Sequence, residues 1–222
     1  IGQYASDVLK DADRSGFDER QNAALTDLEK IMGHISEIQK AYTERRWKEL
    51  EFHADAIDDF FSRPDVLAEV DQAELEEMQK FVALFRADGA MQLGRLDRAE
   101  EQYGIALGLY GKSEPDSIQT LVTKNKLAAL YLAQGKPEKA LVQYEKAELQ
   151  YRKSLPVDDR SFAAFVGQIG ETHYVMGNMK EAESRFLESL NLYEKVRDPL
   201  PMDTELARVN LAKTYLAQGR WS

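Results

Sequence analysis

The residues Gly111-Lys112-Ser113 are the first of three candidate groups whose residue types and spacing could do chemistry. Glycine, lysine and a hydroxyl residue in this order are typical of a loop that cradles phosphate groups. Such a loop also needs a glycine five residues before Gly111, where Ala106 stands, and it follows a strand, whereas this tripeptide follows a predicted helix. We therefore expect no nucleotide site here.

The histidines His34, His53 and His173 are the second candidate for chemistry. No two of them have the His-x-x-x-His spacing that places two metal ligands on one face of a helix. His173 occupies a position between paired helices, so we interpret it as a core histidine. The sequence contains no cysteine, which excludes disulfides, thiol nucleophiles and cysteine-ligated zinc. We expect no metal and no cofactor.

The carboxylates Asp55, Asp58 and Asp59 form the third candidate. We favour a solvated acidic helix face, and the alternative is a site for a cation or a basic partner. No Ser-His-Asp arrangement can be defended from spacing alone. The sequence therefore predicts a protein without a catalytic site of its own.

The charge is unevenly distributed over the 222 residues. Residues 1–80 hold 10 Lys and Arg against 20 Asp and Glu, whereas residues 81–222 hold 19 of each kind, and the net charge is −10. No basic stripe is present to neutralise phosphates, so we expect no nucleic-acid partner. No apolar run approaches the length of a membrane span. Together with the lack of cysteine, this favours a cytoplasmic protein.

The elements that position these residues are helices. Apolar residues recur at spacings of three and four, and Pro combined with Asp or Ser marks the longer connections. No strand pattern is present, so the predicted fold class is all-α. The predicted helices span residues 3–13, 18–43, 47–61, 73–92, 96–111, 117–134, 137–153, 160–176, 179–196 and 203–218.

Gly135 stands at the centre of a pattern that recurs along the chain. Ala128 and Tyr131 lie seven and four residues before it, and Ala140 and Tyr144 lie five and nine residues after it. Small residues let two helices approach closely, and aromatic residues fill the remaining space. Related patterns surround Gly94, Gly177 and Gly219, at intervals of 41, 42 and 42 residues. A fixed period of this size with helical content indicates a stacked repeat array.

This spacing resembles the tetratricopeptide repeat (TPR). The longer period, and the text Asn-Leu-Ala-Lys-Thr-Tyr-Leu-Ala-Gln-Gly from Asn210, resemble the extended repeats of kinesin light chains and many bacterial regulators. The resemblance covers residues 75–222 and implies a right-handed α-α superhelix, a TPR-like solenoid. Arg86 and Ala90 depart from it, because Leu and Tyr are usual at these positions.

The expected organisation has two parts. Residues 1–72 form an N-terminal helical region in which residues 18–61 are a degenerate repeat, or alternatively a coiled-coil or helical-bundle cap. Residues 73–222 form the TPR array, with a truncated last repeat. The chain begins with Ile1 and ends at Ser222, where a partner helix should start, so we expect a fragment of a longer protein. We also expect self-association through the C-terminal edge.

The resemblance implies a concave groove lined by the first helix of each repeat. This lining is mostly apolar, and Asn125, Glu171 and Lys213 would fix the register of a bound segment. The Lys/Asn clamp that captures chaperone C-terminal carboxylates in some relatives is absent. The positions that we expect to line the groove are Phe81, Leu84, Asp88, Met91, Val122, Asn125, Leu132, Glu171, Tyr174, Val209, Lys213 and Leu216.

The expected function is non-catalytic binding of a protein or peptide, as a scaffold or sensor region of a larger, bacterial, cytoplasmic protein. The partner would be an amphipathic helix or an apolar segment, since a large exposed apolar strip normally marks a binding site. Two alternatives stay open. The chain could be the regulatory region of a bacterial peptide-sensing or signalling enzyme whose catalytic part lies outside it, or another part of the full-length chain could cover the groove.

Overall fold

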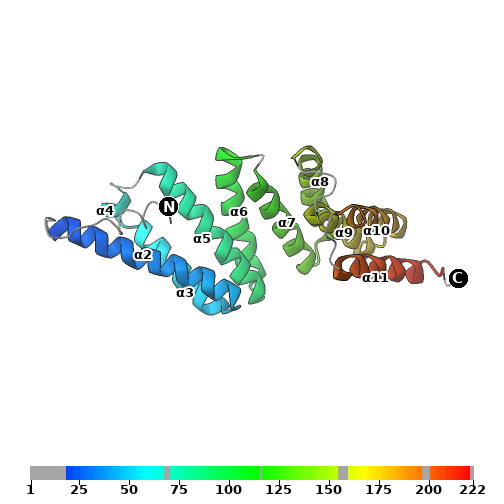
Figure 1. The fold of residues 1–222 in the computed structure, drawn as a ribbon, viewed down its shortest axis with the longest axis horizontal. Coiled ribbons are helices and arrows are strands. Elements are labelled where there is room, and N and C mark those ends of the chain that lie inside the picture. Colours follow the sequence, from blue (N-terminus) through cyan, green and yellow to red (C-terminus); the bar gives the residue numbers. More distant parts are fainter. Residues whose placement is uncertain (1–18, 68–70, 116, 155–159, 197–200, 221–222) are drawn as a thin grey trace. The chain divides into compact units, whose positions relative to one another are not determined.

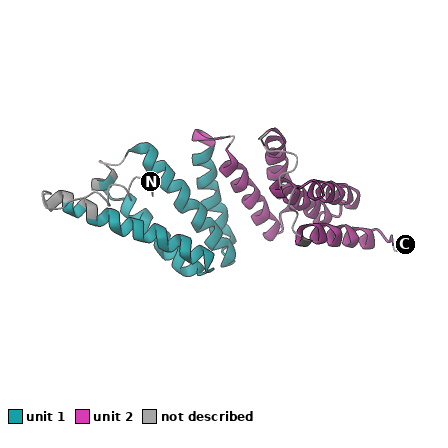
Figure 2. Ribbon diagram, viewed as in Figure 1, with its two compact units in different colours: residues 1–110 teal, residues 111–222 magenta. Residues whose placement is uncertain are grey.

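A computed structural model describes residues 19–67, 71–115, 117–154, 160–196 and 201–220. Within these ranges every regular element is an α-helix, which confirms the predicted all-α fold class. The helix predicted at residues 3–13 lies outside the described residues. The chain forms two compact units, residues 1–110 and residues 111–222 (Figure 2). The predicted division after residue 72, which rests on repeat type, stays a prediction.

Unit 1 (residues 1–110) is built from packed helix pairs (Figure 1). α2 (Glu19–Thr43) packs against α3 (Trp47–Phe61), and α3 packs against α5 (Gln72–Gln92). The short α4 (Pro64–Leu67) lies between them in the chain and begins at Pro64, because proline fits the first turn of a helix. α6 (Leu96–Ser113) follows α5, and its last residues belong to the second unit.

Unit 2 (residues 111–222) continues the alternation with α7 (Ile118–Ala133), α8 (Pro137–Ser154), α9 (Arg160–Val175), α10 (Met179–Tyr193) and α11 (Pro201–Ala217). α10 stops three residues before the predicted end at 196. Beyond this end the chain changes to the tighter pattern of a 3-10 turn. The N–H groups of Lys195 and Val196 donate to the carbonyls three residues before them. α11 begins two residues before the predicted start, at Pro201, again because proline is favoured at the first helical position.

The short turns between paired helices share one geometry. Gly94, Gly135, Gly177 and Gly219 all have positive φ, between 70° and 79°. After Gly135, the N–H of Lys136 donates to the carbonyl of Tyr131 over 2.8 Å, and the N–H of Gly135 donates to Leu132. This is the Schellman arrangement that closes a helix on a left-handed residue. The repeat period therefore corresponds to a physical event, the end of each first helix.

Arg45 takes the same backbone conformation between α2 and α3, with φ of 58°. The N–H of Arg46 donates to the carbonyl of Ala41 over 2.7 Å, as Lys136 does to Tyr131. α2 and α3 are thus joined by the turn that joins the later pairs, although no glycine marks it. A side chain in this conformation is strained, because its Cβ crowds the following carbonyl.

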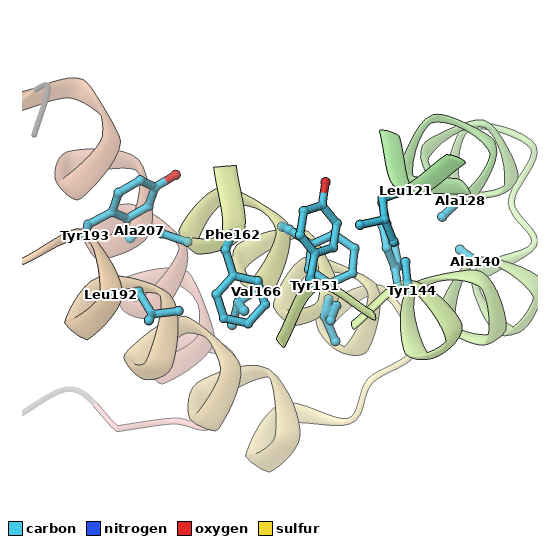
Figure 3. Close-up of a cluster of buried hydrophobic side chains, with 14 residues drawn as sticks. Leu121, Ala128, Ala140, Tyr144, Tyr151, Phe162, Val166, Leu192, Tyr193 and Ala207 are labelled. Carbon is cyan, nitrogen blue, oxygen red and sulfur yellow. The ribbon is translucent and has the colours of Figure 1, made fainter. Parts of the chain in front are cut away.

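The core of unit 2 is filled by small and aromatic residues in alternation. Ala128 of α7 and Ala140 of α8 are both fully buried and point toward each other (Figure 3). Tyr151 and Phe165 pack with ring centroids 4.7 Å apart, and Tyr144 meets Phe165 edge-on at 5.5 Å. The small pair sets a close approach of α7 and α8, and the rings fill the space between α8 and α9.

α9 and α10 approach each other at two glycines. A Cβ placed on Gly170 would lie 2.8 Å from ring atoms of Phe186, and one on Gly167 would lie 3.1 Å from Oγ of Ser189. The Ser189 hydroxyl donates to the carbonyl of Ala163 over 2.8 Å. Both glycines have ordinary helical backbone, so their backbone conformation does not require glycine. Glycine is needed here because the two helices approach too closely for a Cβ.

The predicted close contacts at the second helix of each repeat are confirmed. Ala99, Ala140 and Ala182, each five residues after a turn glycine, are all 0% exposed. In unit 1, Ile57 and Leu50 of α3 are likewise fully buried, in a cluster that includes Ile38 of α2 and Val82 of α5. Each unit therefore has its own apolar core, and the first helices keep a second face outside it.

Candidate functional site

Four of the predicted groove residues lie on α5 in unit 1. Phe81, Leu84, Asp88 and Met91 are each half-buried, whereas the intervening Ala87 is fully buried. The hydroxyl of Tyr103, on α6, donates a hydrogen bond to Oδ1 of Asp88 over 2.5 Å. Burial and the charge of Asp88 raise the pKa of Tyr103, so the phenol keeps its proton and orients the carboxylate.

The other eight lie in unit 2, on α7, α9 and α11. α9 contacts both α7 and α11, so the three first helices form one continuous layer within this unit. Val122, Glu171, Val209, Lys213 and Leu216 are exposed, whereas Asn125, Leu132 and Tyr174 are half-buried. Leu132 packs against the core of unit 2, so it contributes less to the outer face than predicted. The assignment of all twelve residues to a binding groove stays a prediction.

α11 carries the most exposed apolar stripe of that layer. Leu206, Val209 and Leu216 are 60%, 47% and 50% exposed, and Lys213 lies among them on the same face. The opposite face is buried through Ala207 and Thr214. Side chains at spacings of three and four residues share one face of a helix, so this stripe is continuous along α11.

Polar groups beside this layer are held in apolar surroundings. Oδ1 of Asn125 and Oε1 of Gln168 are buried and accept no hydrogen bond within the described residues. Burial raises the pKa of Tyr144, and the negative charge of Glu171 raises it further. Tyr144 therefore stays neutral. Glu171, on α9, lies close enough to α8 for its charge to act on the Tyr144 phenol.

An aromatic group that the sequence analysis missed lies beside Asp88 in unit 1. The Tyr42 ring, on α2, meets Phe85 at a centroid distance of 5.3 Å and Trp47 at 5.6 Å, both edge-on at 85°. The ring centroids of Phe81 and Phe85 lie 4.6 Å apart. Tyr42 stands three residues before the turn residue Arg45, as Met91 stands three before Gly94. If a residue other than glycine had been accepted at the turn position, Arg45 would have marked this turn. The same spacing would then have placed Tyr42 among the groove positions.

The structure also brings together two of the histidines. Nδ1 of His34, on α2, lies 2.8 Å from Nδ1 of His53, on α3. Burial lowers the pKa of His34, and the neighbouring His53 lowers it further. An open cleft of about 440 Å3 adjoins His34 and is lined also by Asp27, Lys30 and Arg63. The His-x-x-x-His spacing applies to two histidines of one helix, so it does not reveal this contact between two helices. His173, predicted to be a core residue, is only half-buried.

The acidic residues of α3 are more than a solvated face, which corrects the sequence interpretation. Arg86 of α5 donates to Asp55 over 2.6 Å and to Asp58 over 2.9 Å. Its side chain is only 13% exposed, whereas the two carboxylates are nearly half exposed. Arg86 is also the position where Leu is usual, so the departure from the repeat pattern and the acidic cluster have one explanation. Asp59 is exposed, as predicted.

The remaining chemical candidates find no site. Gly111, Lys112 and Ser113 form the exposed C-terminal end of α6, where carbonyl groups face outward and disfavour phosphate. Across the part of the chain that the structure describes, no three His, Asp or Glu side chains are grouped as metal ligands would be. None of the helices in that part combines the length and apolar character needed to cross a membrane.

Comparison with known proteins identifies the repeats. Residues 81–155 match the family model described as tetratricopeptide repeat. Residues 81–155 are TPR repeats. The match includes α7 and α8 with the turn at Gly135, and it confirms the resemblance read from the sequence. Among curated proteins, none matches this chain.

Solved structures of TPR-like proteins share the fold. The crystal structure of BtubC (BKLC) from P. vanneervenii has a TM-score of 0.70 at 19% identity, covering 99% of this chain and 84% of that one. A putative kinesin light chain from Podosopora anserina has a TM-score of 0.69 at 15% identity. The match covers 86% of this chain and 88% of that one. A Rap protein complexed with Competence and Sporulation Factor has a TM-score of 0.66 at 17% identity. The match covers all of this chain and 56% of that one. At these identities the likeness concerns the fold.

Proposed function

We propose that this chain is a non-catalytic scaffold or sensor region that binds a protein or peptide through the outer face of its first helices. The observation that carries the proposal is the stripe on α11, where Leu206, Val209 and Leu216 are each about half exposed or more. Apolar surface left in water is unfavourable by roughly 25 cal/mol per Å². A continuous exposed strip of this kind is typical of a binding surface.

The chemistry of the surface favours an amphipathic helix or an apolar segment as the partner. Apolar positions alternate with the charged Glu171 on α9 and Lys213 on α11, both of which are exposed. A bound helix would bury its apolar face against Val209 and Leu216 and would set its register by pairing charges with these two residues. The buried acceptor of Asn125 would gain a donor if the amide turned toward a bound backbone.

A second candidate function is regulation within a larger bacterial signalling protein. The Rap structure that resembles this chain was determined with Competence and Sporulation Factor bound, and this chain corresponds in extent to 56% of that protein. By this proposal the chain would be a cytoplasmic sensor region whose catalytic part lies outside it. The proposal includes no cofactor, no metal and no nucleic-acid partner.

The test compares two variants that place aspartates at exposed apolar positions of different helices. The first carries Leu206→Asp, Val209→Asp and Leu216→Asp on α11. The second carries Val142→Asp and Leu149→Asp on α8, where both side chains are also exposed, at 46% and 65%. Partners captured from a bacterial lysate are identified for the wild type and for both variants, after circular dichroism has shown equal helix content.

We expect the α11 variant to lose its specific partners and the α8 variant to keep them. An identical set of partners from all three proteins would contradict the proposed surface. Sedimentation velocity on the same proteins measures the proposed self-association through the C-terminal edge, which the α11 substitutions should abolish. If the α11 variant associates as the wild type does, that edge is not the self-association surface.

A further inference from the structure

The exposed face of α11 has the residue spacing of a helix that pairs with another helix. Met202, Leu206, Val209, Lys213 and Leu216 follow each other at intervals of four, three, four and three residues. All five side chains are exposed, and Met202 reaches 79%. A repeat close to 3.5 residues keeps one seam of a helix against a partner helix. We call these five residues the α11 seam.

Lys213 is the one charged residue of the α11 seam. Its side chain is exposed, and it makes no ion pair with another residue of the described ranges. A lysine in such a seam lowers the stability of a helix pair, and in return it specifies the register. It selects a partner helix that has an acidic residue at the level of the lysine, because a seam of apolar residues alone would leave its charge unpaired.

α11 itself carries an acidic residue at the required level. Glu205 and Lys213 lie four residues before and four residues after Val209, which is about 6 Å along the helix axis in each direction. A second α11 that runs antiparallel and is centred on Val209 therefore brings its Glu205 to the level of Lys213. Two-fold symmetry forms the same contact a second time. A parallel copy would instead place Lys213 against Lys213.

The apolar residues of the α11 seam also find partners in the antiparallel arrangement. Met202 and Leu216 lie seven residues on either side of Val209, so each meets the other across the pair. Val209 meets its own copy at the two-fold axis. Leu206 lies at the level of Ala212, a small residue that is exposed as well. The face is therefore complementary to itself in apolar surface and in charge.

The charges around the α11 seam do not oppose this pairing. Glu205 pairs with Arg208 over 2.8 Å, but both side chains are more than half exposed. An exposed pair of this kind is weak, so Glu205 can exchange Arg208 for a lysine. Residues 111–222, the unit that carries α11, hold 16 Lys and Arg against 15 Asp and Glu. Charge repulsion between two copies of this unit is therefore small.

We propose that the α11 seam pairs with the α11 seam of a second copy of this chain, antiparallel and centred on Val209. Lys213 of each copy pairs with Glu205 of the other, and apolar residues fill the contact around them. This inference rests on the proposed function and names the amphipathic helix that the surface of unit 2 binds. α11 supplies both the apolar spacing and the acidic residue that such a partner needs.

The first test exchanges the two charges in the intact chain. Glu205→Lys and Lys213→Glu each turn both contacts between unlike charges into contacts between like charges, whereas the double variant restores them in reverse. Sedimentation equilibrium gives the dissociation constant of the dimer. We expect each single variant to raise this constant by about tenfold or more, and the double variant to return to within about threefold of the wild type. In a parallel pair neither single variant would change it.

Two exposed residues of α8 provide the controls. Glu145→Lys and Lys146→Glu make the same changes of charge outside the α11 seam and should leave the dissociation constant within about twofold. Circular dichroism checks that all variants keep the wild-type helix content. The inference is wrong if the wild-type chain stays monomeric at every concentration, or if the single variants of the α11 seam associate as the wild type does.

The second test uses the absence of cysteine from the chain. A disulfide needs two Cα atoms within about 7 Å of each other. Val209→Cys should therefore cross-link to its own copy under mild oxidation. Leu216→Cys should cross-link only when it is mixed with Met202→Cys. Leu149→Cys, on α8 and 65% exposed, measures cross-linking by random collision. Efficient cross-linking of Leu216→Cys to itself would indicate a parallel pair and would overturn the inference.

The inference and the proposed function fail separately. If the charge variants associate as the wild type does and the triple aspartate variant of α11 loses its partners from the lysate, the binding surface of unit 2 stands and the antiparallel pairing is wrong. If the double charge variant restores the dimer and the triple aspartate variant captures the same partners as the wild type, the pairing stands. The surface proposed for other partners is then wrong.

Discussion

Nδ1 of His34 and Nδ1 of His53 lie 2.8 Å apart and join α2 to α3. One nitrogen must donate a proton and the other must accept it, so the contact tolerates one proton between the two atoms and not two. Burial lowers the pKa of His34, and His53 lowers it further. The charged groups around the adjoining cleft are Asp27, Lys30, Asp59 and Arg63.

This contact predicts that unit 1 loses stability in mild acid. The folded state holds the pKa of His34 below the ordinary value of 6.5, so it binds fewer protons than the unfolded chain does. The stabilisation is present in full above that value and declines as the pH falls through the lowered pKa. Urea unfolding followed by Trp47 fluorescence in a Trp221→Phe background, which leaves one tryptophan, should show lower midpoints at pH 5 than at pH 7.5.

The His34→Gln variant should reduce this pH dependence, because it removes the group whose pKa the folded state lowers. If His34→Gln and the wild type lose stability equally between the two pH values, the His34–His53 contact is not what responds to acid.

Replacing Arg45 with glycine should stabilise unit 1. Arg45 has φ of 58°, a conformation that costs a residue with a Cβ about 1 kcal/mol and costs glycine little. Arg45→Gly should therefore raise the free energy of unfolding by roughly 0.5–1 kcal/mol, measured by urea denaturation. The reverse change, Gly135→Ala at φ of 70°, should lower it by a similar amount. A loss of stability in Arg45→Gly would mean that the side chain contributes more than its strained backbone costs.

A methyl group at Gly170 should be strongly destabilising. Its carbon would lie 2.8 Å from two ring atoms of Phe186, which is 2% exposed and has no room to move. We expect Gly170→Ala to cost about 1–3 kcal/mol, as overpacking of a filled core does. Gly108→Ala is the matched control, because nothing lies within 4 Å of the added carbon. In α6 that change should stabilise by about 0.5–1 kcal/mol, since alanine favours helix. Thermal unfolding of both variants is the measurement, and equal melting temperatures would contradict the close approach of α9 and α10.

A larger side chain at Ala140 should test the contact between α7 and α8. Ala140 is 0% exposed and faces Ala128 (Figure 3). Ala140→Leu adds three carbons where none fits and should cost about 1–3 kcal/mol. Val142→Leu, two residues further on the same helix and 46% exposed, should change stability by less than about 0.5 kcal/mol. The repeat register is wrong if the two variants unfold at the same urea concentration.

Much of the fold could be predicted from the sequence because its determinants are local. Helix ends follow from Gly94, Gly135 and Gly177, whose positive φ costs glycine almost nothing, and from prolines at helix starts. The buried alanines follow from their fixed distance to those glycines. Signals of this kind act within about ten residues, so the chain carries them whatever the rest of the molecule does.

The candidate site depends on contacts between helices, and these could not be derived from the sequence. Arg86 meets Asp55 and Asp58 from 31 and 28 positions away, and His34 meets His53 from 19. Tyr42 joins the aromatic group beside Asp88 because α2 and α5 pack together. Such contacts depend on the rotation of one helix against another. That rotation is decided by the fit of many side chains across the interface, and no single residue or spacing encodes it.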